Sequence, residues 1–171
     1  FVPRYDPNTD TQLSLGDLVG KNHSLFVTAE VNGQTIQSDK VTLSFSSAAY
    51  RLEVENEISA ALSLDTIKTN QQKVIFRLLA DYDGSGTFGE LAQWDTNALD
   101  RLIINAGKFP GTTETVYDAG GKPVGKAFTP KYDENNNGGI PFTAVAGRTH
   151  EIVATLSGTA LRATASVEVL A

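Results

Sequence analysis

The sequence of 171 residues contains no cysteine and no methionine. Without cysteine the chain has no disulfide bonds, no thiolate metal site and no thiol nucleophile. No apolar run reaches the ~18 residues of a membrane-spanning helix, and the amino terminus lacks the pattern of a signal peptide. Because Phe1 stands where an initiator methionine would be, we expect that the chain has been processed or trimmed from something larger.

Positive charge is also scarce. The chain has 14 basic against 20 acidic residues, a formal net charge of −6. No cluster of lysine and arginine forms a basic stripe, so electrostatics does not favour binding to nucleic acid or to an anionic membrane. We therefore expect no nucleic-acid partner and no membrane insertion, whereas the acidic balance agrees with binding of cations.

Groups that commonly carry catalysis are few. His23 and His150 are the only two imidazoles, and they lie far apart in the sequence without metal-ligand spacing. No Gly-x-Ser-x-Gly elbow and no phosphate-binding glycine loop is present. The acids Glu55 and Glu57 alternate along one predicted strand, which indicates a solvated face rather than a pair that hydrolyses glycosides. We expect that the protein is not an enzyme.

Strand signals dominate what is present. Runs that alternate apolar and polar residues, or that carry β-branched and aromatic residues, are separated by turn signals such as Asn32-Gly33. With many short strands and close turns, the sequence predicts a mainly β protein, an antiparallel β-sandwich of immunoglobulin-like or jelly-roll-like type. The runs are 24–31, 34–37, 41–45, 50–55, 73–80, 115–117, 123–128, 150–156 and 161–170.

One segment has helical rather than strand spacing. Apolar residues recur between Asp95 and Ala106, with an N-cap candidate before them and Gly107 after them, which predicts one short helix at about 95–106. Residues 1–20 carry two prolines and little alternation, so we expect an amino-terminal arm followed by a single sandwich domain over 21–171.

The most specific motif lies in the middle of the chain. Asp81, Asp83 and Ser85 place oxygen ligands at every second position, Gly86 stands sixth and the Thr87 carbonyl seventh. Alternate residues of a tight loop point inward, which suits the six to eight oxygens that Ca²⁺ prefers. The segment resembles the first two-thirds of an EF-hand calcium loop. An alternative interpretation is a strand-to-helix connection rich in Asx turns.

The resemblance ends at the twelfth position, where an EF-hand has a bidentate glutamate and this chain has Ala92. Glu90 or Asp95 would have to supply that carboxylate by a different route. We therefore expect weak binding, in the range of ~10⁻⁴–10⁻³ M that is typical of extracellular calcium modules.

Two further stretches repeat the pattern less completely. In the carboxyl-side loop Asp133, Asn135, Asn137 and the Gly139 carbonyl are the candidate ligands, again without an acid at the twelfth position, and a plain polar loop is the alternative. At the amino terminus the segment resembles a dockerin-like loop but has Thr11 in place of the sixth-position glycine, so a solvated arm is the alternative. Its candidate ligands are Asp6, Asn8, Asp10 and Asp17.

These observations lead us to expect a Ca²⁺-binding structural subunit that is secreted or displayed on the cell surface. Such a subunit would assemble with copies of itself into a fibre, tube, surface layer or adhesin, for instance by adding the arm 1–20 to a neighbour's sheet edge. The chain is similar in length and general character to donor-strand fibre subunits and to calcium-dependent cannula proteins. The alternative is a calcium-dependent module that binds a polysaccharide or another partner, with Trp94 or Tyr82 near the ligand.

Overall fold

The computed structural model describes residues 22–44 and 48–171. The chain is mainly β, with 48% strand and 12% helix, and it contains several antiparallel sheets, as the sequence predicts. It divides into two compact units, one of residues 1–49 with 81–87 and the other of residues 50–80 with 88–171. The predicted arm 1–20 lies outside the described residues. No helix within the described residues is long and apolar enough to span a bilayer.

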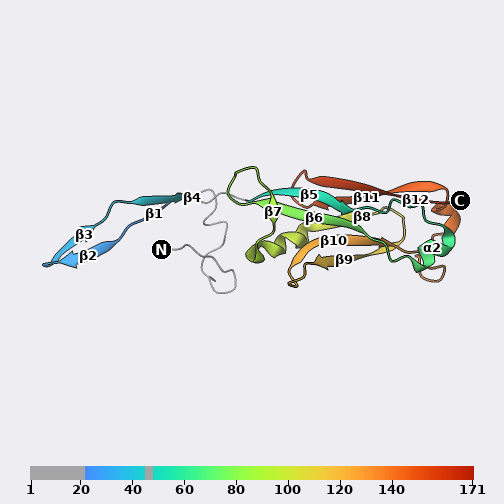
Figure 1. Ribbon diagram of the computed structural model, residues 1–171, viewed down its shortest axis with the longest axis horizontal. Coiled ribbons are helices and arrows are strands. Elements are labelled where there is room, and N and C mark those ends of the chain that lie inside the picture. Colours follow the sequence, from blue (N-terminus) through green and yellow to red (C-terminus); the bar gives the residue numbers. More distant parts are fainter. Residues whose placement is uncertain (1–21, 45–47) are drawn as a thin grey trace. The chain divides into compact units, whose positions relative to one another are not determined.

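In the smaller unit, residues 22–44 form a two-stranded ribbon (Figure 1). Strands β2 (Thr28–Val31) and β3 (Gln34–Gln37) pair around Asn32 and Gly33, whose φ values of 53° and 76° are those of a type I′ turn. This confirms the hairpin that the Asn-Gly pair predicts. Strands β1 (Asn22–Leu25) and β4 (Val41–Ser44) continue the pairing.

A break separates the two halves of the ribbon, so the strand predicted over 24–31 is in fact two strands. The amide of Val27 donates to Ser38 Oγ at 3.0 Å, and Val27 accepts the amide of Ser38 at 2.9 Å. Between this pair and the Leu25–Val41 pair, one side of the ribbon has the single residue Phe26, and the other side has the two residues 39–40. The extra residue is the mark of a β-bulge, which keeps the ribbon paired while shifting its register.

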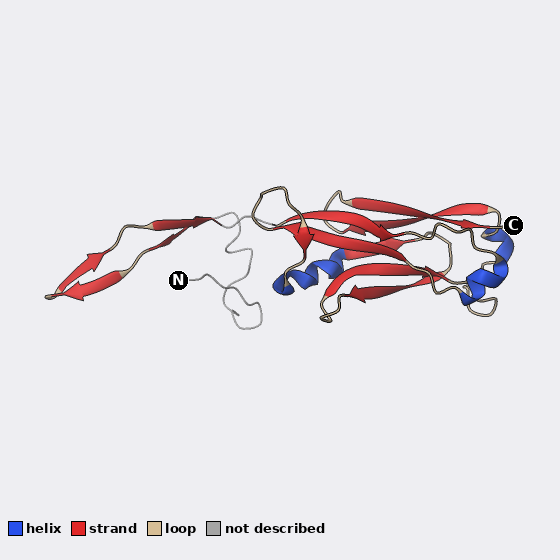
Figure 2. Cartoon of the chain, in the orientation of Figure 1, coloured by secondary structure: helices blue, strands red, loops and turns tan. Residues whose placement is uncertain are grey.

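The larger unit contains two sheets (Figure 2). In the first, β5 (Ala49–Asn56), β6 (Val74–Asp81), β10 (Pro123–Pro130) and β9 (Gly111–Tyr117) lie in that order, and the short β7 (Gly89–Glu90) also pairs with β6. In the second, the order is β12 (Arg162–Val169), β11 (Arg148–Leu156) and β8 (Leu102–Asn105).

The core of the larger unit follows the period-two alternation of its strands. Strand β6 buries every second side chain, and β11 and β12 do the same. Such alternation gives each sheet one apolar face, so the unit has a sandwich-like architecture. The largest fully buried side chains include Phe76, Leu78, Leu102, Ile152, Leu156 and Val167.

The helix predicted at about 95–106 has different boundaries. A 3-10 helix, η1 (Gln93–Arg101), occupies the first part, and the second part is strand β8, which pairs with β11. The run Leu102-Ile103-Ile104 fits the helical period locally, but pairing with β11 and burial of Leu102 favour the extended conformation. Gly107, with φ 62°, therefore lies in the turn after a strand rather than at the end of a helix.

Two helices were not predicted. Helix α2 (Leu64–Thr69) begins after Ser63, whose side chain accepts the Thr66 amide while the Thr66 side chain accepts the Ser63 amide. This reciprocal cap and the complete burial of Ile67 hold a helix of only six residues in place. A shorter 3-10 helix, η2, covers Phe142–Ala144.

Candidate functional site

The loop that follows β6 is built around the carboxylate of Asp81. Its Oδ1 accepts the amides of Asp83 and Gly84 at 3.2 and 2.9 Å, and its Oδ2 accepts the amide of Gly86 at 2.8 Å. Asp81 is only 5% exposed. The three donors compensate part of the cost of burying a charge, and they bend the backbone into a tight loop.

The next two ligand candidates repeat the same turn. Asp83 Oδ1 accepts the amide of Ser85 at 3.0 Å, and Ser85 Oγ accepts the amide of Thr87 at 3.2 Å. Hydrogen bonding from the Ser85 side chain and amide lowers the pKa of Asp83, so this carboxyl stays charged at neutral pH. Gly86, at the predicted sixth position, has φ 81°, a conformation that other residues rarely adopt.

The loop therefore offers three kinds of oxygen from four residues: the carboxylates of Asp81 and Asp83, the Ser85 hydroxyl and the Thr87 carbonyl. No lysine, arginine or histidine of the described residues forms an ion pair with Asp81. A buried carboxylate without a countercharge suits a cation, although Ca²⁺ needs six to eight oxygens and water or another group would have to complete the set. Within the described ranges, no three or more His, Cys, Asp or Glu side chains gather as a metal-binding group.

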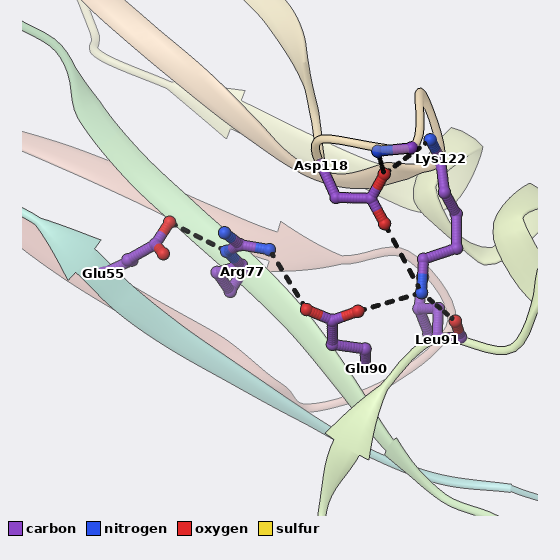
Figure 3. Close-up of polar contacts among 7 residues, drawn as sticks. Glu55, Arg77, Glu90, Leu91, Asp118 and Lys122 are labelled. Atoms are coloured by element: carbon purple, nitrogen blue, oxygen red, sulfur yellow. Dashed lines mark hydrogen bonds and ion pairs between the residues drawn. The ribbon is translucent and has the colours of Figure 1, made fainter.

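The carboxylate of Glu90, one candidate for the missing ligand, belongs to an ion-pair network (Figure 3). Lys122 Nζ lies 2.9 Å from Glu90 Oε2 and 3.8 Å from Asp118 Oδ2. Arg77 Nη1 lies 4.0 Å from Glu90 Oε1, and Arg77 Nε donates to Glu55 Oε2 at 2.8 Å. The network joins β5, β6, β7 and the β9–β10 turn, so Glu90 already has a structural role.

Asp95, the other candidate for that ligand, accepts a hydrogen bond from the hydroxyl of Tyr50, at 3.1 Å to Oδ1 and 3.0 Å to Oδ2. This bond joins η1 to β5. The role of Asp95 as a calcium ligand remains a prediction, as does that of Glu90. Trp94, beside it in η1, is 41% exposed.

The carboxyl-side loop also folds on its own side chains. Asp133 Oδ1 accepts the amide of Asn135 at 2.9 Å, and Asn137 Oδ1 accepts the amide of Gly139 at 3.0 Å. The Asn137 side-chain amide donates to the Ile140 carbonyl at 2.7 Å. Because both ends of the Asn137 side chain are occupied within the loop, a cation would have to displace at least one of these bonds.

This loop forms one wall of a cavity of about 450 Å³. The segment 107–112, which leads from the end of β8 into β9, also lines it, and Lys108 and Lys131 are both among the lining residues. Because two lysines line the same space as Asp133, their positive charge disfavours Ca²⁺ at this loop, so the loop after β6 is the stronger calcium candidate of the two. Sequence reasoning missed this cavity because the two lysines are 23 positions apart.

The ribbon of residues 22–44 presents a second candidate surface. Opposite residues of an antiparallel pair share a face, so Ala29, Ile36, Val31 and Gln34 lie on one face of β2–β3. The side chains of Val31 and Ile36 on this face are 48% and 55% exposed. The other face of the same strands is polar and carries Thr28, Glu30, Thr35 and Gln37.

The β1–β4 half is amphipathic in the same way. Its apolar face carries Leu25, Val41 and Leu43 beside His23, while its other face carries only serine, threonine and asparagine. In the described residues nine large apolar side chains are exposed, and five of them belong to the ribbon, although the larger unit is much longer. These five are Phe26, Val27, Val31, Ile36 and Val41. The alternation of apolar and polar residues over 27–31 was a sequence signal for the β2 part of this face.

The four predicted ligands of the amino-terminal stretch, Asp6, Asn8, Asp10 and Asp17, lie outside the described residues. Comparison with known proteins gave no relatives: no protein-family model, no curated protein and no solved structure matches this chain. Functional inference therefore depends on the two loops, the cavity and the ribbon.

Proposed function

We propose that this protein is a calcium-binding structural subunit that assembles with copies of itself outside the cell. The observation that carries the proposal is the exposed apolar face of the ribbon. An isolated two-stranded hairpin is at best marginally stable in water, and apolar residues on one face gain stability when another layer covers them. A subunit that buries this face on assembly would satisfy that requirement.

Charge favours a second copy as the covering layer. Each chain carries a net charge of −6, so two copies repel each other over most of their surfaces. The ribbon has only Lys40 against Glu30 and Asp39, a net of 1 − 2 = −1 over residues 22–44. Contact through the ribbons therefore brings together the apolar surfaces of two copies with little like-charge repulsion.

The calcium part of the proposal draws on the loop after β6. Asp81 is a buried carboxylate without an ion-pair partner among the described residues, and the lowered pKa of Asp83 keeps a second negative charge close by. Calcium would neutralise these charges and reduce the net repulsion between copies. Millimolar calcium outside the cell suits a loop that lacks the bidentate glutamate.

Light scattering during a calcium titration, from chelator to ~10 mM with magnesium as the control ion, tests this function. We expect particles to grow with calcium alone. Ile36→Lys should abolish growth because it places a charge on the apolar face of the ribbon. Ile103→Lys is the matched control, since Ile103 is 52% exposed on β8, close to the 55% of Ile36.

Asp83→Asn should shift growth to higher calcium concentration, whereas Asp100→Asn, at an exposed position of η1, should not. Growth of the Ile36→Lys variant at the wild-type rate would contradict the role of the ribbon. A protein that stays monomeric while calcium raises its melting temperature would be a calcium-stabilised module instead. An absence of any response to calcium would contradict the calcium interpretation of the loops.

A further inference from the structure

The cavity between segment 107–112 and loop 133–140 lies entirely within the larger unit. Its walls are held by hydrogen bonds from Lys131 N to the Pro110 carbonyl, at 3.1 Å, and from the Tyr132 hydroxyl to the Ile140 carbonyl, at 3.2 Å. The ring of Phe109, one of the lining residues, stacks on His150 with centroids 4.2 Å apart. Its volume of about 450 Å³ is within the range of small-molecule sites, ~300–1,000 Å³.

Two cations at this cavity lack partners. Neither Lys108 Nζ nor Lys131 Nζ has a hydrogen bond or an ion pair with any of the described residues, and both residues line the space. All five other described lysines are engaged by a carboxylate, a carbonyl or an aromatic ring. These are Lys40, Lys68, Lys73, Lys122 and Lys126. In an acidic chain, two unengaged lysines at one cavity favour an anionic ligand.

Uncharged and acidic groups share the same walls. The side chains of Thr112 and Asn136 make no hydrogen bond to the described residues, and Asp133 Oδ2 is not used in the turn that occupies Oδ1. Asp133 would repel a bare inorganic anion, but it accepts hydrogen bonds from hydroxyl groups. The ligand that fits must therefore carry both a negative group for the lysines and hydroxyl donors for Asp133.

We propose that this cavity binds an acidic sugar, with the sugar carboxylate at Lys108 and Lys131 and its hydroxyls at Asp133, Thr112 and Asn136. The combination of a carboxylate and several hydroxyls on one ring is that of a uronic acid. The site would let the protein hold an acidic polysaccharide, and it depends neither on calcium nor on contact between ribbons. It therefore stands apart from the function proposed above.

Isothermal titration calorimetry tests the site, in buffer with chelator so that calcium bridging between uronates and the protein is excluded. The probes are a trisaccharide of galacturonic acid, the neutral trisaccharide of galactose and inorganic sulfate. We expect heat of binding with the galacturonate alone. Absence of galacturonate binding, or equal binding of sulfate or of the neutral sugar, would overturn the assignment.

Single variants assign the binding to the cavity. Lys108→Gln and Lys131→Gln should each weaken galacturonate binding about tenfold, as expected for loss of a charged hydrogen bond. Arg148→Gln removes the same charge from an exposed cation that does not line the cavity, so it should bind like the wild type. Equal losses in all three variants would mean only general charge attraction, and would also overturn the assignment.

Discussion

Tyr50 shows how a single side chain can respond to pH far from neutrality. Burial, followed by the hydrogen bond to Asp95, raises the pKa of Tyr50 to about 12 from its ordinary value of 10.0. The protonated hydroxyl is the form that donates to Asp95, so the folded state favours the neutral tyrosine. The bond stabilises the fold below pH 10, and this stabilisation is lost as the pH rises through 12.

The first prediction concerns Tyr50→Phe. This variant should lower the free energy of unfolding by about 1 kcal/mol at pH 7. The advantage of the wild type should shrink and then reverse as the pH rises from 10.0 through about 12, because only the wild type has a partly buried hydroxyl to ionise. Urea denaturation as a function of pH measures both quantities. Tyr117→Phe, at a residue that is 60% exposed, is the control and should change little. A wild-type advantage that keeps its pH 7 value above that pH would contradict the raised pKa of Tyr50.

Gly125 is required by the close approach of two strands. A Cβ atom on this residue would lie 2.3 Å from the Phe76 carbonyl oxygen on β6, and a backbone atom cannot move aside cheaply. We predict that Gly125→Ala lowers stability by about 2–3 kcal/mol, in the range of overpacked cores. Gly89→Ala on β7 meets nothing within 4 Å and should be nearly neutral. Similar melting temperatures for the two variants, measured by circular dichroism, would refute the steric explanation.

At the scale of elements, we predict that the apolar face of the ribbon is buried on assembly while its polar face is not. Two neighbouring residues, one on each face, allow the comparison. Because the chain has no cysteine, a single introduced thiol can report on one face. Gln34 shares the apolar face with Val31, and Thr35 lies on the polar face with Glu30. During calcium-driven assembly, labelling of the thiol in Gln34→Cys should slow by at least tenfold, while labelling in Thr35→Cys should not change. Equal protection at both positions would rule out burial of one face.

Elements also show where sequence reasoning succeeds and where it fails. The Asn-Gly turn and the alternating strands were predictable because their signals are local. The prediction of a helix at 95–106 was wrong in its second half, because those residues form β8. This strand is stabilised by pairing with β11, more than 40 residues away in the sequence. Helix α2 had a local signal in Ser63 and Thr66, but its six residues are too few for a clear apolar period.

At the scale of the whole molecule, assembly can be separated from the stability of the larger unit. We predict that removing residues 1–20 abolishes calcium-dependent growth, as expected if the arm adds to a neighbour's sheet. The melting temperature of the remaining chain should stay within a few degrees, because the sandwich core belongs to residues 50–80 and 88–171. Light scattering and calorimetry measure the two effects, and growth of the truncated chain would contradict the proposed role of the arm.

The sequence alone determined the β class, the turn at Asn32-Gly33 and the oxygen spacing of the loop after β6, because each depends on residues within a few positions of one another. Only the tertiary structure decided which carboxylates were engaged elsewhere. Glu90 and Asp95 follow the loop closely in the sequence, yet their partners are Lys122 and Tyr50. The cavity at Lys108 and Lys131 likewise exists only because two distant turns meet. Long-range contacts of this kind depend on how strands pair across the whole chain, which no local pattern encodes.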